Sequence, residues 1–556
     1  MKKLPYGISN YEELITDGYY YVDKSKYIEK LENLPEKRIM FLRPRKFGKT
    51  LFTSMLENYY DINKKDKFDK LFCGTYIGEN PTELKNKYYI LKFNFSGIDT
   101  SDVESTIRGF KRAIIVSTKQ FINSYGLEFF VNYEYEAEDI LDELFIAFNA
   151  QKRNEKIYVI IDEYDHFANE LLGFNTNQFK NLVSKNRKVR KWYEILKKGT
   201  ESVVDRIFIT GVAPITLDSL TSGFNISSDK TRDRRLNEMM GFTQEEVIKM
   251  MDSQEISKEN QKIVLPIMKE NYDGYMFSMR GKEKIYNSNM CLYFLNEYTQ
   301  YQEIPEQLID MNIASDYTKL GKMLDLCKGD EREKVIEKTV TGEGIISDIT
   351  GKFNPAMEFT EKDLVSMLFY LGYLTIASEV FEKPELKIPN KVMKELYSEY
   401  FLNILSNETD LIIQENDYNE MLREIALEGK IVSVLQNYLE NLSNRDYIKF
   451  DEKYVKLIFY CIAMNLKIFR LKSEMEVQRR YPDILLIPRN KDKGYKAVMI
   501  EFKYLKKENA DKLKEKEQEA IEQLKEYSEI EEIKEIENLN KYAVIAVGSE
   551  IYVVKV

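Results

Sequence analysis

The chain has 556 residues, enough for roughly two to four domains. It is 43% hydrophobic and 31% charged, as in an ordinary globular protein. A single histidine, His166, argues against Ser-His-Asp, Cys-His and histidine-rich metal chemistry, which leaves carboxylates, lysines and hydroxyls as reactive groups. With a net charge of −10, any nucleic-acid binding must come from local basic patches.

The sequence also predicts where the protein acts. No run of about eighteen apolar residues indicates a transmembrane helix, and Met1 to Gly7 lack the apolar core of a signal peptide. The four cysteines are scattered, which suits reduced thiols better than disulfides or a zinc site. We therefore expect a cytoplasmic protein with no membrane partner.

The first thirty residues are rich in tyrosine. Tyr19 to Ser25 predicts a strand followed by a capped helix that runs to Leu31. Tyr6 or Tyr21 is a candidate for packing on an adenine ring. Because the chain has 39 tyrosines, a core position is the favoured alternative for both.

A strand, a loop and a helix follow each other at residues 39–60. The apolar residues 39–42 predict a short buried strand, and the apolar pattern of residues 51–60 predicts a helix. Between them lies RPRKFGKT, which ends in Gly-Lys-Thr. This is the layout of a P-loop, in which main-chain N–H groups at a helix N-terminus attract phosphate oxygens.

The loop supplies the expected nucleotide contacts. Lys49 would reach the β- and γ-phosphates, and the Thr50 hydroxyl would coordinate Mg²⁺. The predicted cofactor-binding residues of the loop are Arg45, Lys46, Gly48, Lys49 and Thr50. The general motif has glycine where this chain has Arg43, and an ordinary strand-to-helix turn is the alternative.

Two further predicted strands end in polar residues. Tyr158 to Glu163 is an apolar run that ends in two carboxylates. Asp162 would hold Mg²⁺ through water, and Glu163 would polarise the attacking water. Arg206 to Val212 contains Thr210, at the place of a γ-phosphate sensor. The three strands in this order favour ATP and Mg²⁺ as cofactors.

Basic residues concentrate at residues 184–198. This stretch interleaves Trp192 and Tyr193 with lysines and arginines, a pattern that suits phosphate contacts and base stacking. A solvated helix face is the favoured alternative. The predicted nucleic-acid contacts are Lys188, Arg190 and Lys191. A little later, one of Arg232, Arg234 and Arg235 is a candidate arginine finger or sensor.

Several motifs together carry a family resemblance. They are LPYGISNYEELITDGYYYVDKSKYI, RPRKFGKT, IIDEYD, FITGV, GFTQEEV and YDGYMF, spread over about the first 300 residues. In this order they resemble the bacterial AAA-ATPase-like proteins that carry a C-terminal PD-(D/E)XK nuclease domain. The resemblance implies a P-loop ATPase fold, and it implies that an arginine at the place of Arg43 is normal for the family.

The middle of the chain gives weaker signals. Residues 297–348 are polar and helical, as in a linker or lid. The apolar run 364–376 and the segment 386–400 predict a small helical or winged-helix unit, with a packing spacer as the alternative to DNA binding.

The last hundred residues predict a helix, three strands, a helix and two closing strands. Asp483 precedes the second strand, and Glu501 and Lys503 end the third, two residues apart and so on one face. Two carboxylates beside each other can hold one or two Mg²⁺ ions, and the lysine can orient the nucleophile. This order resembles the core of the PD-(D/E)XK nucleases, including the proline before the aspartate.

Other acidic residues are weaker candidates for this site. Glu452, in the first helix, matches a position where such enzymes carry a further acidic ligand, so it is included as catalytic. Glu474 and Glu476 compete with it and are better explained as surface charges. Gln523 lies on the helix after the third strand, where relatives often carry a glutamine.

The sequence therefore predicts an α/β protein. We expect a P-loop ATPase domain at residues 1–295, a mostly helical, winged-helix-like region at 296–430, and a PD-(D/E)XK nuclease-like domain at 431–556. The favoured function is an ATP-dependent, Mg²⁺-dependent nuclease, and the class of architecture suggests defence against foreign DNA. The alternative is a non-enzymatic nucleotide switch with a binding module. The expected partner is nucleic acid, with DNA favoured over RNA, and a homo-oligomer is left open.

Overall fold

The computed structural model describes most of the chain as two compact units. The described residues are 1–166, 187–214, 227–310, 319–324, 330–340, 342–351, 353, 359–409, 423–428, 452–464, 466, 468–473, 481–489, 493–548 and 550–556. The N-terminal unit contains Met1–Val335 and Gly344–Val392, and the C-terminal unit contains Ile336–Glu343 and Met393–Val556. In these ranges, no helix has the length and apolar character needed to cross a membrane.

A five-stranded parallel sheet forms the core of the N-terminal unit. Its strand order is β2-β3-β4-β1-β5. The strands are β1 (Arg38–Leu42), β2 (Tyr88–Asn94), β3 (Lys156–Asp162), β4 (Val204–Gly211) and β5 (Ser228–Asp229). The first four are largely buried apolar runs, as expected for a parallel sheet covered on both faces. The predicted strands at 39–42, 158–163 and 206–212 are thus confirmed to within a few residues.

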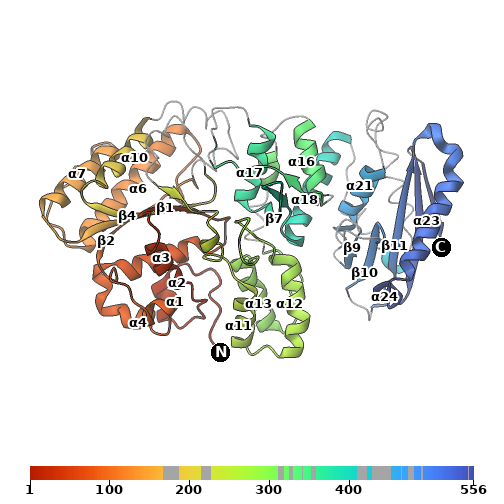
Figure 1. Ribbon diagram of the computed structural model, residues 1–556, viewed down its shortest axis with the longest axis horizontal. Helices are drawn as coiled ribbons and strands as arrows, with labels where there is room; N and C mark the ends of the chain where they lie inside the picture. Colours follow the sequence, from red (N-terminus) through yellow and green to blue (C-terminus); the bar gives the residue numbers. More distant parts are fainter. Residues whose placement is uncertain are drawn as a thin grey trace. The chain divides into compact units, whose positions relative to one another are not determined.

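Helices cover both faces of this sheet (Figure 1). On one side lie α6 (Val103–Ser124), α7 (Ala137–Ala150) and α10 (Arg187–Gly199), which pack on one another and on β2. On the other side lies α3 (Lys49–Tyr60), which packs on β2 and β3 and carries α1 (Tyr11–Thr16). Helix α3, which follows the P-loop, is therefore packed between the sheet and α1.

The expected strand at residues 19–22 is absent from the structure. This segment leads without regular secondary structure into α2 (Lys26–Glu32), although Tyr20 N–H donates to the Lys3 carbonyl at 2.8 Å. Further helices of the unit are α4 (Phe68–Phe72), α5 (Tyr76–Glu79), α11 (Gln244–Ser253), α12 (Lys258–Tyr272), α13 (Ser288–Tyr301) and α15 (Lys319–Leu324).

The middle of the chain contains a helix followed by a small sheet. Helix α17 (Glu361–Leu371) begins with a capping box between Thr360 and Asp363 and ends at Gly372, whose φ is 84°. Strands β7 (Thr375–Val380) and β8 (Lys383–Lys387) then form an antiparallel hairpin with β6 (Ile345–Ile346) at its side. Helices α16 (Asp330–Val340) and α18 (Lys391–Thr409) flank this part in the sequence.

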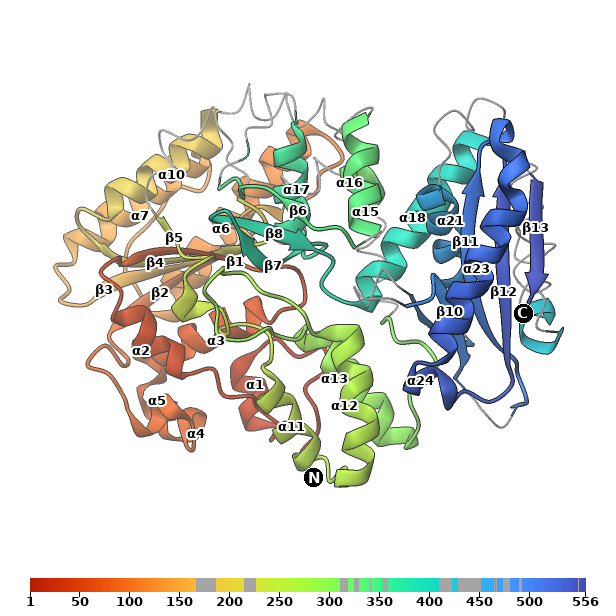
Figure 2. The same ribbon diagram turned by 45° about the vertical axis from the view of Figure 1, so that its right-hand side comes forward.

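A second five-stranded sheet, with order β13-β12-β11-β10-β9, forms the C-terminal unit. The strands are β9 (Phe469–Lys472), β10 (Ile484–Pro488), β11 (Ala497–Leu505), β12 (Leu539–Val547) and β13 (Glu550–Lys555). Among the neighbouring strands of this sheet, only β11 and β12 are parallel. A parallel pair needs a long crossover connection, and here it contains α23 (Leu513–Ser528) and α24 (Glu531–Lys534), which Figure 2 shows beside the strands. The predicted strand and helix order of this domain is confirmed.

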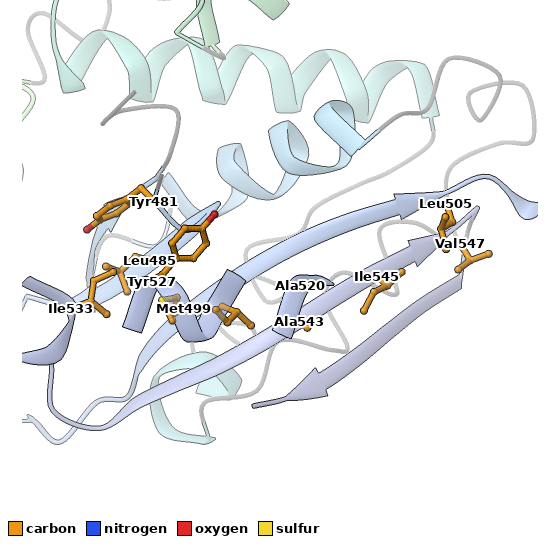
Figure 3. Close-up of a cluster of buried hydrophobic side chains, with 11 residues drawn as sticks. Tyr481, Leu485, Met499, Leu505, Ala520, Tyr527, Ile533, Ala543, Ile545 and Val547 are labelled. Atoms are coloured by element: carbon orange, nitrogen blue, oxygen red, sulfur yellow. The ribbon is translucent and has the colours of Figure 1, made fainter. Parts of the chain in front are cut away.

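The two faces of this sheet pack against different helices. On one face, an apolar cluster joins the sheet to α23 and α24, and it includes Met499 and Leu505 of β11 (Figure 3). On the other face, Phe502 of β11 packs on Phe459 of α21 (Glu452–Met464), with ring centres 5.2 Å apart. Successive residues of β11 therefore alternate between the α23 face and the α21 face.

Candidate functional site

The P-loop connects the end of β1 to the start of α3. Gly48 precedes the first residue of α3 and has a φ of 87°, a conformation that side-chain-bearing residues rarely adopt. Lys46 also has a positive φ, of 67°. The loop is therefore wound tightly, and it presents the N-terminus of α3, the kind of helix end that attracts phosphate oxygens in proteins.

Arg43, at the place of the first P-loop glycine, is a structural residue. It is 1% exposed, and its guanidinium lies between the rings of Phe41 and Phe277, at 4.1 and 4.2 Å from their centres. It donates hydrogen bonds of 2.8–3.3 Å to the carbonyls of Leu42, Thr231, Leu236 and Asn237. Burial lowers the pKa of Arg43 to about 9, and these acceptors favour the charged form at neutral pH.

Lys49 lies over the loop rather than in solvent. Its ammonium donates to the carbonyl of Arg43 at 3.1 Å and to that of Pro44 at 3.0 Å. Burial lowers the pKa of Lys49, while Glu163 and Asp162 oppose that shift. The ammonium is thus placed between the loop and the two carboxylates that follow β3.

Asp162 is a buried carboxylate at the C-terminal end of β3. It has no exposed surface, and within the described part of the chain neither of its oxygens has a hydrogen-bond partner. Burial raises the pKa of Asp162, whereas the nearby Thr50 hydroxyl and the Lys49 ammonium lower it. The Thr50 hydroxyl is close to the carboxylate but outside hydrogen-bond geometry. A buried carboxylate without donors is costly unless a cation compensates it. Thr50 and Asp162 therefore suit Mg²⁺, held by the hydroxyl and through water.

Glu163 follows directly and has a strained backbone. Its φ is 51°, and its side chain lines the cavity beside the P-loop, with one oxygen 3.5 Å from Nδ1 of His166. Asp165, two residues further on, is buried and accepts from the N–H groups of Val212 and Ala213 at 2.7–3.0 Å. Asp165 thus ties the turn after β3 to the end of β4 and fixes where Glu163 points.

Thr210 is a residue of β4, the strand that lies between β3 and β1 in the sheet. It pairs with Phe41 in the register of β1 and β4, so it belongs to the strand between the P-loop and Asp162. Its hydroxyl is buried and has no hydrogen-bond partner among the described residues. This position agrees with the expected place of a phosphate sensor, although contact with phosphate stays a prediction.

A cavity of about 510 Å³ opens beside the loop. It is lined by Arg45 and the P-loop residues 46–52, by the N-terminal residues 5, 7–9, 20–22 and 24, and by residues 239–242, 288, 289 and 292. Its size lies in the range of small-molecule sites. Tyr21 lines the cavity, whereas Tyr6 is outside this lining and hydrogen-bonds to Asp310.

Two later segments support the loop from outside the motif. The hydroxyl of Ser288 donates to the Lys46 carbonyl at 3.1 Å, and the N–H of Gly241 donates to the Phe47 carbonyl at 3.1 Å. Neither contact has a signal in the sequence, because both join residues about 200 or more positions apart.

The arginine candidates lie on the surface. All three arginines, Arg232, Arg234 and Arg235, are exposed, and none of them lines the cavity beside the P-loop. Arg235 pairs with Asp233 at 2.6 Å. Which of them contacts a phosphate therefore stays open.

The predicted base stacking in the basic stretch is wrong. Trp192 is completely buried and packs edge-on against Phe93 and Phe110, and Tyr193 is 3% exposed. Helix α10 is amphipathic, and its aromatic side chains form its core face, so they cannot reach a base. Lys191 is exposed and Arg190 pairs with Glu194 at 2.9 Å, so phosphate contacts by Lys188, Arg190 and Lys191 stay a prediction.

A second polar cluster lies in the C-terminal unit. Asp483, Glu501 and Lys503 are 6%, 3% and 5% exposed. In β11, Glu501 and Lys503 lie between Met499 and Leu505 and share their face, which is the α23 face drawn in Figure 3. Lys503 donates to Glu501 at 2.9 Å, and its ammonium is 3.9 Å from Glu519 of α23.

Asp483 is anchored to the same strand. One of its oxygens, Oδ2, accepts from the main-chain N–H of Phe502 at 2.7 Å. The carboxylate is thereby held next to Glu501, and their mutual repulsion contributes to the titration of Glu501. The structure thus brings the three predicted residues into one cluster.

Burial dominates the electrostatics of this cluster. It raises the pKa of Glu501 to about 7, and the charge of Asp483 adds to the shift while Lys503 opposes it. Burial also raises the pKa of Asp483. Glu501 Oε2 is buried and has no hydrogen-bond partner in the described ranges. Perturbed carboxylates in a buried cluster are typical of functional sites.

These residues fit a magnesium ion. The described residues contain no group of three or more His, Cys, Asp or Glu side chains placed to hold a metal. Magnesium, however, needs only one or two carboxylates and keeps several waters. Asp483 and Glu501, with the unpartnered Oε2 of Glu501, supply such a pair.

The helix α21 adds a residue that the sequence analysis missed. Lys456 places its ammonium 2.8 Å from Asp483 Oδ1. Glu452, the predicted acidic ligand, begins the same helix four residues earlier, but its side chain is outside the described structure, as are Glu474 and Glu476. The helical spacing of four was the available signal for Lys456. Gln523 of α23 has a buried side-chain oxygen without a partner among the described residues.

Comparisons with known proteins agree with this geometry. Residues 5–221 match a family described as "Predicted AAA-ATPase", and residues 450–556 match the "PD-(D/E)XK nuclease superfamily". The chain is also similar to an "Uncharacterized protein in vnfD 5'region" from Azotobacter chroococcum mcd 1, with 25% identity over 257 residues. That match covers 44% of this chain and 44% of the relative's length.

Proposed function

Because this chain joins an AAA-ATPase-like domain to a domain of the PD-(D/E)XK nuclease superfamily, we propose that it is an ATP-dependent nuclease. In this proposal the N-terminal site binds and hydrolyses ATP, and the C-terminal site cleaves phosphodiester bonds. The observation that carries the proposal is the buried cluster of Asp483, Glu501 and Lys503, since a module that only binds has no need of all three.

The residues of the N-terminal site have distinct roles in this proposal. The N-terminus of α3 and Lys49 bind the β- and γ-phosphates. Glu163 holds and polarises the attacking water, and its strained backbone fixes the direction of its carboxylate. Mg²⁺, when bound by Thr50 and Asp162, neutralises phosphate charge.

The residues of the C-terminal site also have separate roles in this proposal. Asp483 and Glu501 provide the carboxylate pair for one or two Mg²⁺ ions, which when bound polarise the scissile phosphate and lower the pKa of water. Lys503 orients the nucleophile or neutralises developing charge, and its bond to Glu501 holds it in place. The mainly apolar packing around the cluster limits access of bulk water.

The test uses purified full-length protein with plasmid, linear DNA and RNA. Each substrate is incubated with and without Mg²⁺ and with and without ATP. We expect cleavage that requires Mg²⁺ and depends on ATP, with DNA preferred over RNA. Binding without cleavage of any substrate would support the non-enzymatic switch instead. A role in defence against foreign DNA predicts that cells carrying the wild-type chain, but not an Asp483→Ala variant, resist infection by phage.

A further inference from the structure

The C-terminal cluster contains two lysines, and only one of them belongs to the Glu-x-Lys pattern. Lys503 pairs with Glu501, its neighbour on the same strand face. Lys456 comes from α21 and pairs with Asp483 Oδ1 at 2.8 Å. The side chains of Lys456 and Asp483 are 17% and 4% exposed, so solvent screens this pair only weakly.

The position of Lys456 conflicts with metal binding by Asp483. Oδ2 of Asp483 already accepts from the N–H of Phe502 at 2.7 Å, which occupies one of its lone pairs and makes Oδ1 the oxygen with fewer main-chain constraints on binding a cation. Lys456 lies on that oxygen. An ammonium has three donors and no acceptor, so it cannot share in coordinating a metal, and two cations at one oxygen repel each other.

We propose that Lys456 is a positioning residue that acts as an internal counter-ion of Asp483. It neutralises Oδ1 in the metal-free protein and is displaced when a divalent cation binds. The pair therefore raises the metal concentration at which the site fills. The role of the Lys456–Asp483 pair in catalysis rests on the proposed nuclease function. Its effect on metal affinity can be measured without any cleavage.

A purely structural ion pair is the competing explanation. In that case Lys456 would only fasten α21 to the sheet, and its loss would reduce stability without improving metal binding. If Lys456 instead competes with the metal, its removal makes metal binding tighter. The two explanations thus predict different metal affinities.

The experiment measures Mn²⁺ affinity of the full-length, nucleotide-free protein by calorimetry and by electron paramagnetic resonance. Lys456→Met should bind Mn²⁺ roughly tenfold more tightly than wild type at the site that Asp483→Asn removes, because a repelling charge next to the ligand is lost. Lys534→Met is the control. It removes one positive charge from α24, where Lys534 pairs with Glu529 at 2.7 Å, and it should leave the affinity unchanged.

An unchanged or weaker Mn²⁺ affinity in a folded Lys456→Met protein would overturn the inference. If that variant does not fold, Lys456→Arg provides the test. Arginine keeps the cation and binds a carboxylate with two donors, so Mn²⁺ affinity should fall severalfold, and an unchanged affinity would again overturn the inference. If Lys456→Met binds Mn²⁺ more tightly but the wild-type protein cleaves no nucleic acid, the inference about Lys456 stands and only the proposed nuclease function is contradicted.

Discussion

The guanidinium of Arg43 lies 4.2 Å from the centre of the Phe277 ring, and so joins the P-loop to a segment more than 200 residues away. It also binds carbonyls of residues 231, 236 and 237. Arg43, which departs from the general P-loop motif, thus clamps the start of the P-loop to residues 231–237 and to Phe277 through hydrogen bonds and a cation–π contact. Its contacts are to the protein rather than to the nucleotide cavity.

Arg43→Gly, which restores the general motif, should therefore destabilise the protein. Four buried carbonyls each lose the hydrogen bond from Arg43 and two aromatic faces lose their cation, so we expect a loss of at least about 3 kcal/mol in the free energy of unfolding. Urea unfolding followed by tryptophan fluorescence measures this, because Trp192 is buried in the same unit. The matched control is Arg232→Gly, which removes an exposed arginine. Equal midpoints for both variants would contradict the clamp.

Lys49→Ala should abolish ATP binding, because the phosphates lose their cation at the N-terminus of α3. Glu163→Gln should keep ATP affinity and slow hydrolysis by roughly 100-fold or more, since it removes the group that polarises water. Calorimetry measures the first effect and phosphate release the second. An ATP affinity unchanged in Lys49→Ala would refute the site.

Asp483→Ala should remove metal-dependent cleavage and leave the fold intact, as followed by circular dichroism. Lys503→Ala should also lower cleavage by roughly 100-fold or more while metal binding largely persists, because an ammonium is not a ligand. ATPase activity should survive both changes. If Asp483→Ala cuts DNA at the wild-type rate, the cluster is not the cutting site.

Glu501 should make stability depend on pH. Its pKa is raised from the ordinary 4.5 to about 7, so its favourable contribution is fully present below pH 4.5 and is lost as the pH rises to about 7. In EDTA, the thermal midpoint of wild type minus that of Glu501→Gln should therefore fall between pH 5 and pH 8. The difference reports Glu501 together with its neighbour Asp483, because groups outside this pair titrate alike in both proteins. A constant difference would contradict the burial of this carboxyl.

Replacing Lys188, Arg190 and Lys191 of α10 with alanine should weaken nucleic-acid binding and flatten its dependence on salt. Each phosphate contact that is lost reduces the number of released counterions by about one. Filter binding over a range of salt concentrations gives the slope. If the slope stays at the wild-type value, this side of α10 is only a solvated face.

Most of the strand and helix order of both domains was predictable because it is local, although the strand expected at residues 19–22 is absent. Apolar runs such as 157–161 and alternation such as that of β11 follow from burial of neighbouring side chains. Gly48, Lys49 and Thr50 stand out because phosphate binding needs these residue types in immediate succession. The stretch 184–198 was misinterpreted because its composition of aromatic and basic residues resembles that of a base-stacking surface. The helical period instead places Trp192 in the core.

By itself, the sequence determined the order of strands and helices, the P-loop, and the spacing that puts Glu501 and Lys503 on one face of a strand. It could not decide which distant groups meet. Tertiary structure alone placed Lys456 on Asp483, Ser288 on the P-loop and Arg43 between Phe41 and Phe277. The physical reason is that each of these contacts depends on how whole helices and loops pack around a sheet, and such packing leaves no periodic pattern in the chain.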